Sequence, residues 1–169
     1  MSQAAKAGPL SRIVDVSRLP QGRGTVTVEA TPAEAEALAR DFGIPGLRDL
    51  VGRFDISGPT SRLVVTGTVE ALVTQVCTVT LEPFETKVSE PVEVEFTDTD
   101  QLAGTDAEDV EVPDPIVGGR IDFGTLTAEF LALGLDPYPR KPGASFEPVQ
   151  AGEDVKPFDA LRRLKDDEG

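Results

Sequence analysis

The chain has 169 residues, and 30 acidic against 16 basic side chains give it a formal net charge of −14. Its length favours one domain with tails, and its charge argues against general RNA coating, which depends on Lys and Arg neutralising phosphates. The chain has no histidine and one cysteine, which excludes Ser–His and Cys–His catalytic pairs and imidazole acid–base catalysis. Neither a basic-then-apolar leader nor an apolar run of membrane-spanning length occurs in it, so we expect a soluble, cytoplasmic protein.

Two short strands and a helix are expected in the N-terminal part. Apolar residues alternate weakly over residues 11–16 and 24–30, as they do in short strands. The helix begins where Thr31 can cap it, a proline takes the first helical position, and Glu34 completes a capping box. The predicted helix covers Pro32–Phe42.

A meander of three antiparallel strands should follow. Residues 47–51 are expected to form a further short turn of helix before it. Alternation with period two then marks the strands themselves, and Gly67 predicts a bulge or bend within the long middle one. The three predicted strands cover residues 52–57, 62–77 and 84–96.

The hairpin between the last two strands can be placed by parity. Its first strand has small or apolar residues at odd positions and its second at even positions, so facing residues match only across a loop of even length. Loops of two residues (82–83) and of four (80–83) both satisfy this, and four is preferred because Pro83 disfavours a positive φ at Glu82. Either loop places Cys77 on the inner face, so we expect a core residue rather than a reactive thiol.

An acidic segment and a second helix come next. Residues 98–114 hold seven acids and no base, and lack periodicity, which indicates a mobile loop. Their spacing matches no calcium loop, and we expect solvated carboxylates rather than a Mg²⁺ site. The second helix is predicted over residues 122–133, where Leu126, Phe130 and Leu133 recur at helical spacing.

The proline-rich segment 136–143 is the best candidate for a functional site. It contains Tyr138, the only tyrosine, between two prolines, followed by Arg140 and Lys141. Extended proline-rich segments lose little entropy when they dock on a partner, and arginine binds phosphate or carboxylate with two hydrogen bonds. In the alternative interpretation the segment is a structural strap, with Tyr138 packed on the sheet and Arg140 neutralising acids.

The hairpin turn carries a second pair of candidate contact residues and a family resemblance. Glu82 and Phe84 lie in the run Cys77-Thr78-Val79-Thr80-Leu81-Glu82-Pro83-Phe84. This run resembles the hairpin signature of the YceD family, the large ribosomal RNA subunit accumulation proteins of bacteria. Many members read Cys-x-x-Cys-Leu-x-x-Phe there; Thr80 replaces the second cysteine, so neither a zinc site nor a disulfide carries over.

A second block of sequence supports the same resemblance. It comprises residues 121–126, 128–133 and 135–139, read as Ile-Asp-Phe-Gly-Thr-Leu, Ala-Glu-Phe-Leu-Ala-Leu and Leu-Asp-Pro-Tyr-Pro. The resemblance spans residues 8–148 and is strongest to alphaproteobacterial members. It implies a part in the synthesis, processing or stability of the large-subunit (23S) ribosomal RNA, and no known reaction.

These observations lead to one overall expectation. The fold class is α+β: an antiparallel meander sheet, open or curled toward a barrel, with two main helices. Residues 1–148 form one domain, and residues 149–169 form a charged tail with a short amphipathic segment (Phe158, Leu161 and Leu164).

The expected function is that of a non-enzymatic ribosome-biogenesis factor. Its partner would be a ribosomal RNA precursor or a ribosomal or biogenesis protein, with no DNA, membrane, cofactor or metal involved. An adaptor for a phospholipid or fatty-acid synthesis enzyme is the alternative, and a small hydrolytic or redox enzyme ranks third. The candidate contact residues are Tyr138, Arg140, Lys141, Glu82 and Phe84.

Overall fold

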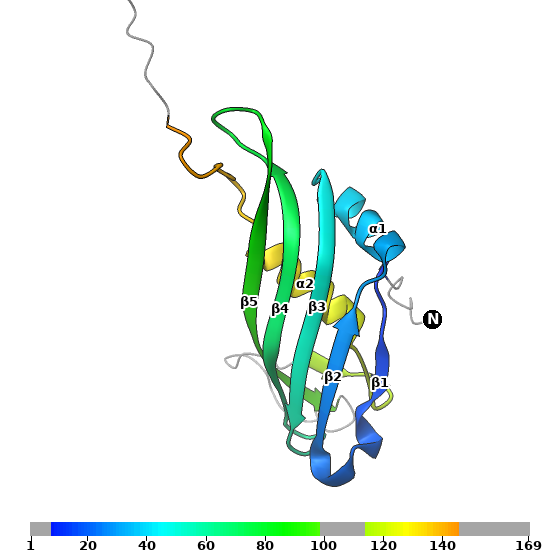
Figure 1. Cartoon of the computed structure of the whole chain (residues 1–169). Coiled ribbons are helices and arrows are strands. Elements are labelled where there is room, and N and C mark those ends of the chain that lie inside the picture. Colours follow the sequence, from blue (N-terminus) through cyan, green and yellow to red (C-terminus); the bar gives the residue numbers. More distant parts are fainter. Residues whose placement is uncertain (1–7, 99–113, 146–169) are drawn as a thin grey trace, which may run out of the picture.

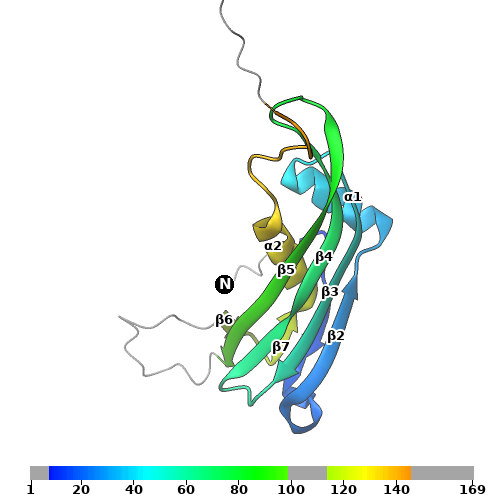
Figure 2. The ribbon, with the colours of Figure 1, turned by 60° about the vertical axis from the view of Figure 1, so that its left-hand side comes forward.

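The computed structural model describes residues 8–98 and 114–145, which fold as an open, curved sheet with a helix on its concave face (Figures 1 and 2). The sheet has the order β2-β3-β4-β5-β6, and a separate small sheet pairs β1 with β7. The predicted α+β class and antiparallel meander are confirmed, and the sheet does not close into a barrel. The strands are β1 (Ile13–Asp15), β2 (Arg23–Glu29), β3 (Gly46–Ser57), β4 (Leu63–Val76), β5 (Pro83–Asp98), β6 (Asp114–Ile116) and β7 (Arg120–Asp122).

Both predicted helices are present, α1 at Pro32–Phe42 and α2 at Phe123–Gly134. The Thr31 hydroxyl accepts the Glu34 amide and the Glu34 carboxylate accepts the Thr31 amide, so the capping box is complete. Two single-turn 3₁₀ segments, Val16–Arg18 and Pro20–Gly22, connect β1 to β2. No helix in the described part of the chain is long and apolar enough to span a membrane.

The expected helical turn at residues 47–51 is wrong, because these residues begin strand β3. Pairing with β4 extends from Ser57 back to Gly46, so the long neighbouring strand overrides the local pattern. A bulge between Arg48 and Val51, with Asp49 at φ 54°, adds one residue to β3. This extra residue reverses the alternation of buried and exposed side chains along β3. The sequence of residues 46–51 therefore lacks the regular alternation that identifies a strand.

The parity argument for the β4–β5 hairpin is confirmed, but both loop lengths were wrong. Ala71 faces Val88 and Val73 faces Thr86, and the ladder ends where Val76 faces Pro83. The loop therefore contains the six residues 77–82, still an even number. Leu81, at φ 60°, supplies the positive φ that closes this loop.

Gly67 lies in β4 without the predicted bulge, since the register with both neighbouring strands is unbroken there. A Cβ atom at this position would clash with the carbonyl oxygen of Arg53 on β3. The glycine therefore permits a close backbone approach between β3 and β4.

The core fills the space between the concave face of the sheet and α2. Phe123 at the start of α2 is fully buried, and its ring lies 5.3 Å from that of Phe54. The N-terminal Leu10 and Val16 also belong to this core. Two predictions lie outside the described residues: the acidic mobile loop, apart from its ends, and the charged tail with its amphipathic segment.

Candidate functional site

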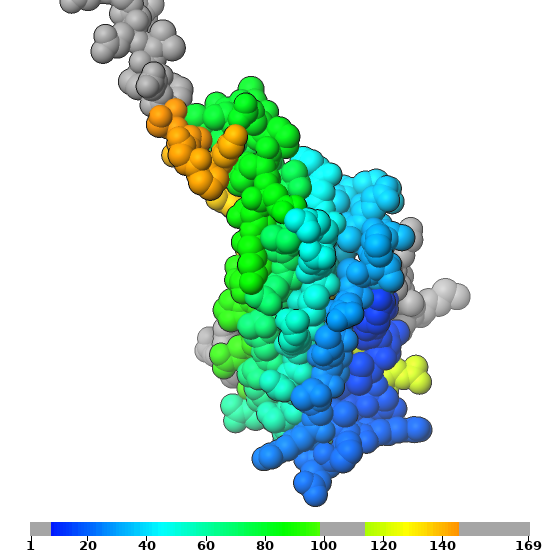
Figure 3. All heavy atoms as spheres, viewed as in Figure 1, coloured from blue at the N-terminus to red at the C-terminus, as the bar shows by residue number. Residues whose placement is uncertain are grey.

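The segment after α2, residues 135–145, runs along the outer end of the β4–β5 hairpin (Figures 1 and 3). We call these residues the strap. The Gln75 side chain donates to the carbonyl oxygen of Asp136 at 3.1 Å, and the Thr78 amide donates to that of Pro139 at 2.9 Å. These bonds attach the backbone of the strap to the hairpin and leave its side chains available.

Cys77 lies at the junction of hairpin and strap and is fully buried. Its Sγ accepts the Lys141 amide at 3.3 Å and the Thr80 amide at 3.5 Å. Hydrogen bonding from the Thr80 side chain and then from the Thr80 amide lowers the pKa of the Cys77 thiol to about 6. The predicted burial is confirmed, and the sulfur also serves as a hydrogen-bond acceptor that organises the loop.

Lys141 joins the two groups of candidate residues. Its Nζ lies 3.1 Å from a carboxylate oxygen of Glu82 in the hairpin loop, although the two residues are 59 positions apart. Both side chains are largely exposed, so the ion pair itself adds little stability. It does place the hairpin turn and the strap on one continuous surface, which we call the hairpin tip (residues 76–84 and 135–145).

Tyr138 is 74% exposed, so the interpretation in which its ring packs on the sheet is wrong. Arg140 is also exposed, and within the described residues its side chain makes no ion pair. Phe84 is half-buried and lines a hollow of about 280 Å³ together with Arg140 and Pro139. The backbone of the strap thus has a structural role, while the side chains of Tyr138 and Arg140 are exposed.

Two exposed apolar residues at the hairpin tip were not predicted as contacts. Leu81 is 76% exposed and adopts a positive φ that a bulky residue rarely takes. Val76, at the end of β4, is 42% exposed and lines a second hollow with Pro137 and Pro139. Val76 alternates with buried neighbours as an ordinary strand residue does, and Leu81 lies in the loop between exposed neighbours, so nothing in the sequence marked either residue as a contact.

The hairpin tip exposes side chains of several chemical kinds. Among residues 8–98 and 114–145, no group of three or more Cys, Asp or Glu side chains is placed to hold a metal ion. The tip offers the exposed aromatic ring of Tyr138, the exposed aliphatic side chains of Leu81 and Val76, and the guanidinium of Arg140. Aromatic and arginine side chains of this kind are common anchors in macromolecular interfaces.

Comparison with known proteins identifies the family. The model of YceD, the large ribosomal RNA subunit accumulation protein, matches residues 65–165, well over half of the chain. The matched region includes nearly all of β4, together with β5, α2 and the strap, and so the whole hairpin tip. No curated protein and no solved structure matches the chain. The chain therefore belongs to the YceD family of large ribosomal RNA subunit accumulation proteins.

Proposed function

We propose that this protein is a non-enzymatic factor in the maturation of the large ribosomal subunit, and that it acts by binding a protein partner at the hairpin tip. The family description relates its members to the accumulation of an RNA and names no reaction. The observation that carries the proposal is the ion pair between Lys141 and Glu82, because it unites two segments distant in sequence into one surface. A cytoplasmic location, where ribosomal subunits mature, follows from this proposal.

The groups exposed at the hairpin tip favour a protein over RNA. Leu81 and Val76 are aliphatic and suit an apolar contact, as does Tyr138. Carboxylates of Glu82, Glu85 and Asp136 lie on or beside the same surface and would repel phosphates. The net charge of −14 would also steer a cationic protein toward the chain.

RNA is a second candidate partner because of Tyr138 and Arg140. An exposed ring beside an unpaired guanidinium can stack on a single-stranded base and bind a neighbouring phosphate. This arrangement would rely on about one phosphate contact, so binding would weaken only slightly with added salt.

Complementation of a deletion strain tests the proposal. The variants Tyr138→Ala and Arg140→Ala should fold normally and fail to restore the level of large-subunit ribosomal RNA, singly or together. Arg23→Ala is the matched control, since Arg23 is also an exposed arginine but begins β2 opposite Ser57, at the end of the sheet away from the β4–β5 hairpin. Full complementation by the double variant would refute a role for the hairpin tip.

Affinity purification distinguishes the kinds of partner. A ribosomal or biogenesis protein that is retained by the wild type and lost with Tyr138→Ala supports the proposal. Retention of ribosomal RNA after removal of proteins would favour the RNA alternative. Co-purification of a phospholipid or fatty-acid synthesis enzyme, lost with the same variant, would favour the adaptor function.

A further inference from the structure

Strand β3 has an unpaired edge beside helix α1. Strand β2 ends at Glu29, opposite Val51, and the Ala30 amide makes the last backbone bond to β3, at Leu50. The chain then turns into α1. Residues 46–48 of β3 pair with β4 on one side, and Asp49 lies in the bulge that follows. Within the described residues nothing pairs with the other side of residues 46–48.

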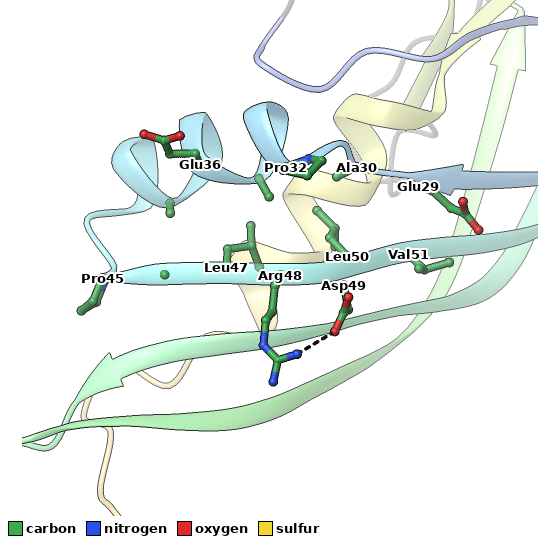
Figure 4. Close-up of a pocket in the computed structure, with 13 residues that line it drawn as sticks. Glu29, Ala30, Pro32, Glu36, Pro45, Leu47, Arg48, Asp49, Leu50 and Val51 are labelled. Carbon is green, nitrogen blue, oxygen red and sulfur yellow. Dashed lines mark hydrogen bonds and ion pairs between the residues drawn. The ribbon is translucent and has the colours of Figure 1, made fainter.

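A groove of about 600 Å³ separates this edge from α1 (Figure 4). The wall formed by the helix includes the small side chains of Ala35 and Ala39, with Pro32 at its end. On the opposite wall, Gly46 has no side chain and Leu47 is half-buried. Because Ala35, Ala39 and Gly46 carry little or no side chain, another backbone can approach the unpaired edge of β3 beside them.

The charges around the groove favour a cationic occupant. Three carboxylates line it, from Glu29, Glu36 and Asp49. Glu36 pairs with Arg40 and Asp49 pairs with Arg48, so among the described residues Glu29 alone of the three makes no ion pair. In Figure 4 the side chains of Arg48 and Asp49 both lie on the side of β3 away from α1. Arg48 donates to Glu85 at 2.8 Å and to Asp49 at 3.1 Å, so its charge is already neutralised. An anionic ligand would therefore find no free cation in the groove.

We propose that this groove binds an extended, Lys- or Arg-containing segment of a partner protein, which adds to β3 as a further strand at residues 46–48. Strand addition to an exposed edge takes its affinity from main-chain hydrogen bonds and its specificity from alternate side chains. Three residues of strand cover roughly 10 Å. Basic side chains of the partner would reach Glu29, which makes no ion pair among the described residues. This inference does not depend on the function proposed for the hairpin tip.

Other occupants fit the groove less well. A second copy of a chain with a net charge of −14 would be repelled. The chain's own residues 146–169 hold seven acids and four bases, so most of their charge is of the same sign as the groove. An RNA strand meets the same repulsion and cannot form the strand ladder.

The test uses the isotopically labelled full-length chain and a hexapeptide of three Val-Lys repeats. We expect saturable amide shifts confined to residues 46–48 and to α1, and at least tenfold slower hydrogen exchange at the newly paired amides. A peptide N-methylated at alternate residues should bind at least tenfold more weakly, because it lacks half of its donors. A Val-Glu peptide should not bind.

Variants of the protein test the role of the Glu29 carboxylate. Glu29→Gln should weaken binding of the Val-Lys peptide severalfold. Glu93→Gln, which changes an exposed acid on β5, should leave binding unchanged.

Several results would overturn the inference. These are the absence of saturable shifts, shifts at another surface, or equal binding of the N-methylated peptide. Shifts of the groove amides on addition of an oligoribonucleotide would show that the groove selects an anion. If Leu161→Asp alone moves these amides without any peptide, the chain's own tail occupies the groove.

Discussion

The backbone amide of Lys141 donates a hydrogen bond to the sulfur of Cys77 across 3.3 Å, joining the strap to the hairpin over 64 positions of sequence. Lys141 also reaches Glu82 in the hairpin loop through its side chain. In many YceD members a second cysteine follows at the position of Thr80; here the Thr80 amide donates to the same sulfur. One cysteine thus holds together the loop and the strap by accepting hydrogen bonds from both.

Cys77 should resist alkylation in the folded protein and react once the protein is unfolded. The sulfur is fully buried, so access rather than ionisation limits the reaction. A bulky maleimide should label native protein at least tenfold more slowly than protein in denaturant, as measured by mass spectrometry. Rapid labelling of the native protein would mean that the hairpin tip opens readily.

Replacing Cys77 by alanine should loosen the strap. Cys77→Ala removes the acceptor of the Lys141 and Thr80 amides, so both should exchange with solvent much faster. Cys77→Ser keeps an acceptor and should preserve most of the protection. If the hydrogen exchange rate of the Lys141 amide is unchanged in Cys77→Ala, the other hydrogen bonds between strap and hairpin are enough to hold the strap in place.

Asp122, a half-buried carboxylate, should contribute strongly to stability because it joins the N-terminal segment to α2. It caps α2 by accepting the amides of Gly124 and Thr125, and it also accepts the Ser11 hydroxyl at 2.6 Å and the Arg12 amide at 2.7 Å. Asp122→Ala should therefore lower the free energy of unfolding by about 2–3 kcal/mol. Asp122→Asn, which keeps one oxygen acceptor, should cost less. Urea denaturation measures both, and a loss below about 0.5 kcal/mol for alanine would contradict the role.

The ion pair between Arg12 and Glu34 should make stability depend on pH in the acid range. Hydrogen bonding from the Arg12 guanidinium, and then from the Thr31 amide, lowers the pKa of Glu34 to about 2. A carboxylate whose pKa is lower in the folded than in the unfolded state stabilises the fold above about pH 4.5, and this contribution disappears as the pH falls toward 2.

The variant Glu34→Gln isolates this contribution. At pH 7 it should be less stable than the wild type by no more than about 1 kcal/mol, because both partners are partly exposed. The difference should shrink steadily between pH 4.5 and pH 2 in denaturation experiments. A difference that stays constant over this range would mean that the charge of Glu34 contributes nothing.

The helices and the pairing of the hairpin could be predicted from sequence because local signals determine them. The capping box at Thr31 and Glu34 is a contiguous motif, and the parity of Val73 and Val88 depends only on alternation. The start of β3 could not be predicted, since the bulge at Asp49 breaks its alternation. That bulge forms through pairing with β4, which is distant in sequence.

The residues of the candidate site could also be predicted from local sequence, whereas their arrangement in space could not. Tyr138, Arg140 and Glu82 were identified by residue type and by their proline-rich or turn context. Their assembly into one surface could not be predicted, because it rests on bonds such as that from Thr78 to Pro139, 61 positions away. Leu81 already lay in the preferred four-residue loop, but a leucine gives no sequence signal for a positive φ or for an exposed side chain, so it was missed as a contact residue.

Tyr138 provides a final prediction, which separates a binding role from a structural one. Its ring is 74% exposed, and the strap is held by backbone bonds on either side of it. Tyr138→Ala should therefore change the free energy of unfolding by no more than about 0.5 kcal/mol. Leu131→Ala is the matched comparison: this fully buried residue of α2 should cost about 2–5 kcal/mol. Both values come from urea denaturation, and a loss above 2 kcal/mol for Tyr138→Ala would show that the ring packs on the sheet and would remove it from the binding surface.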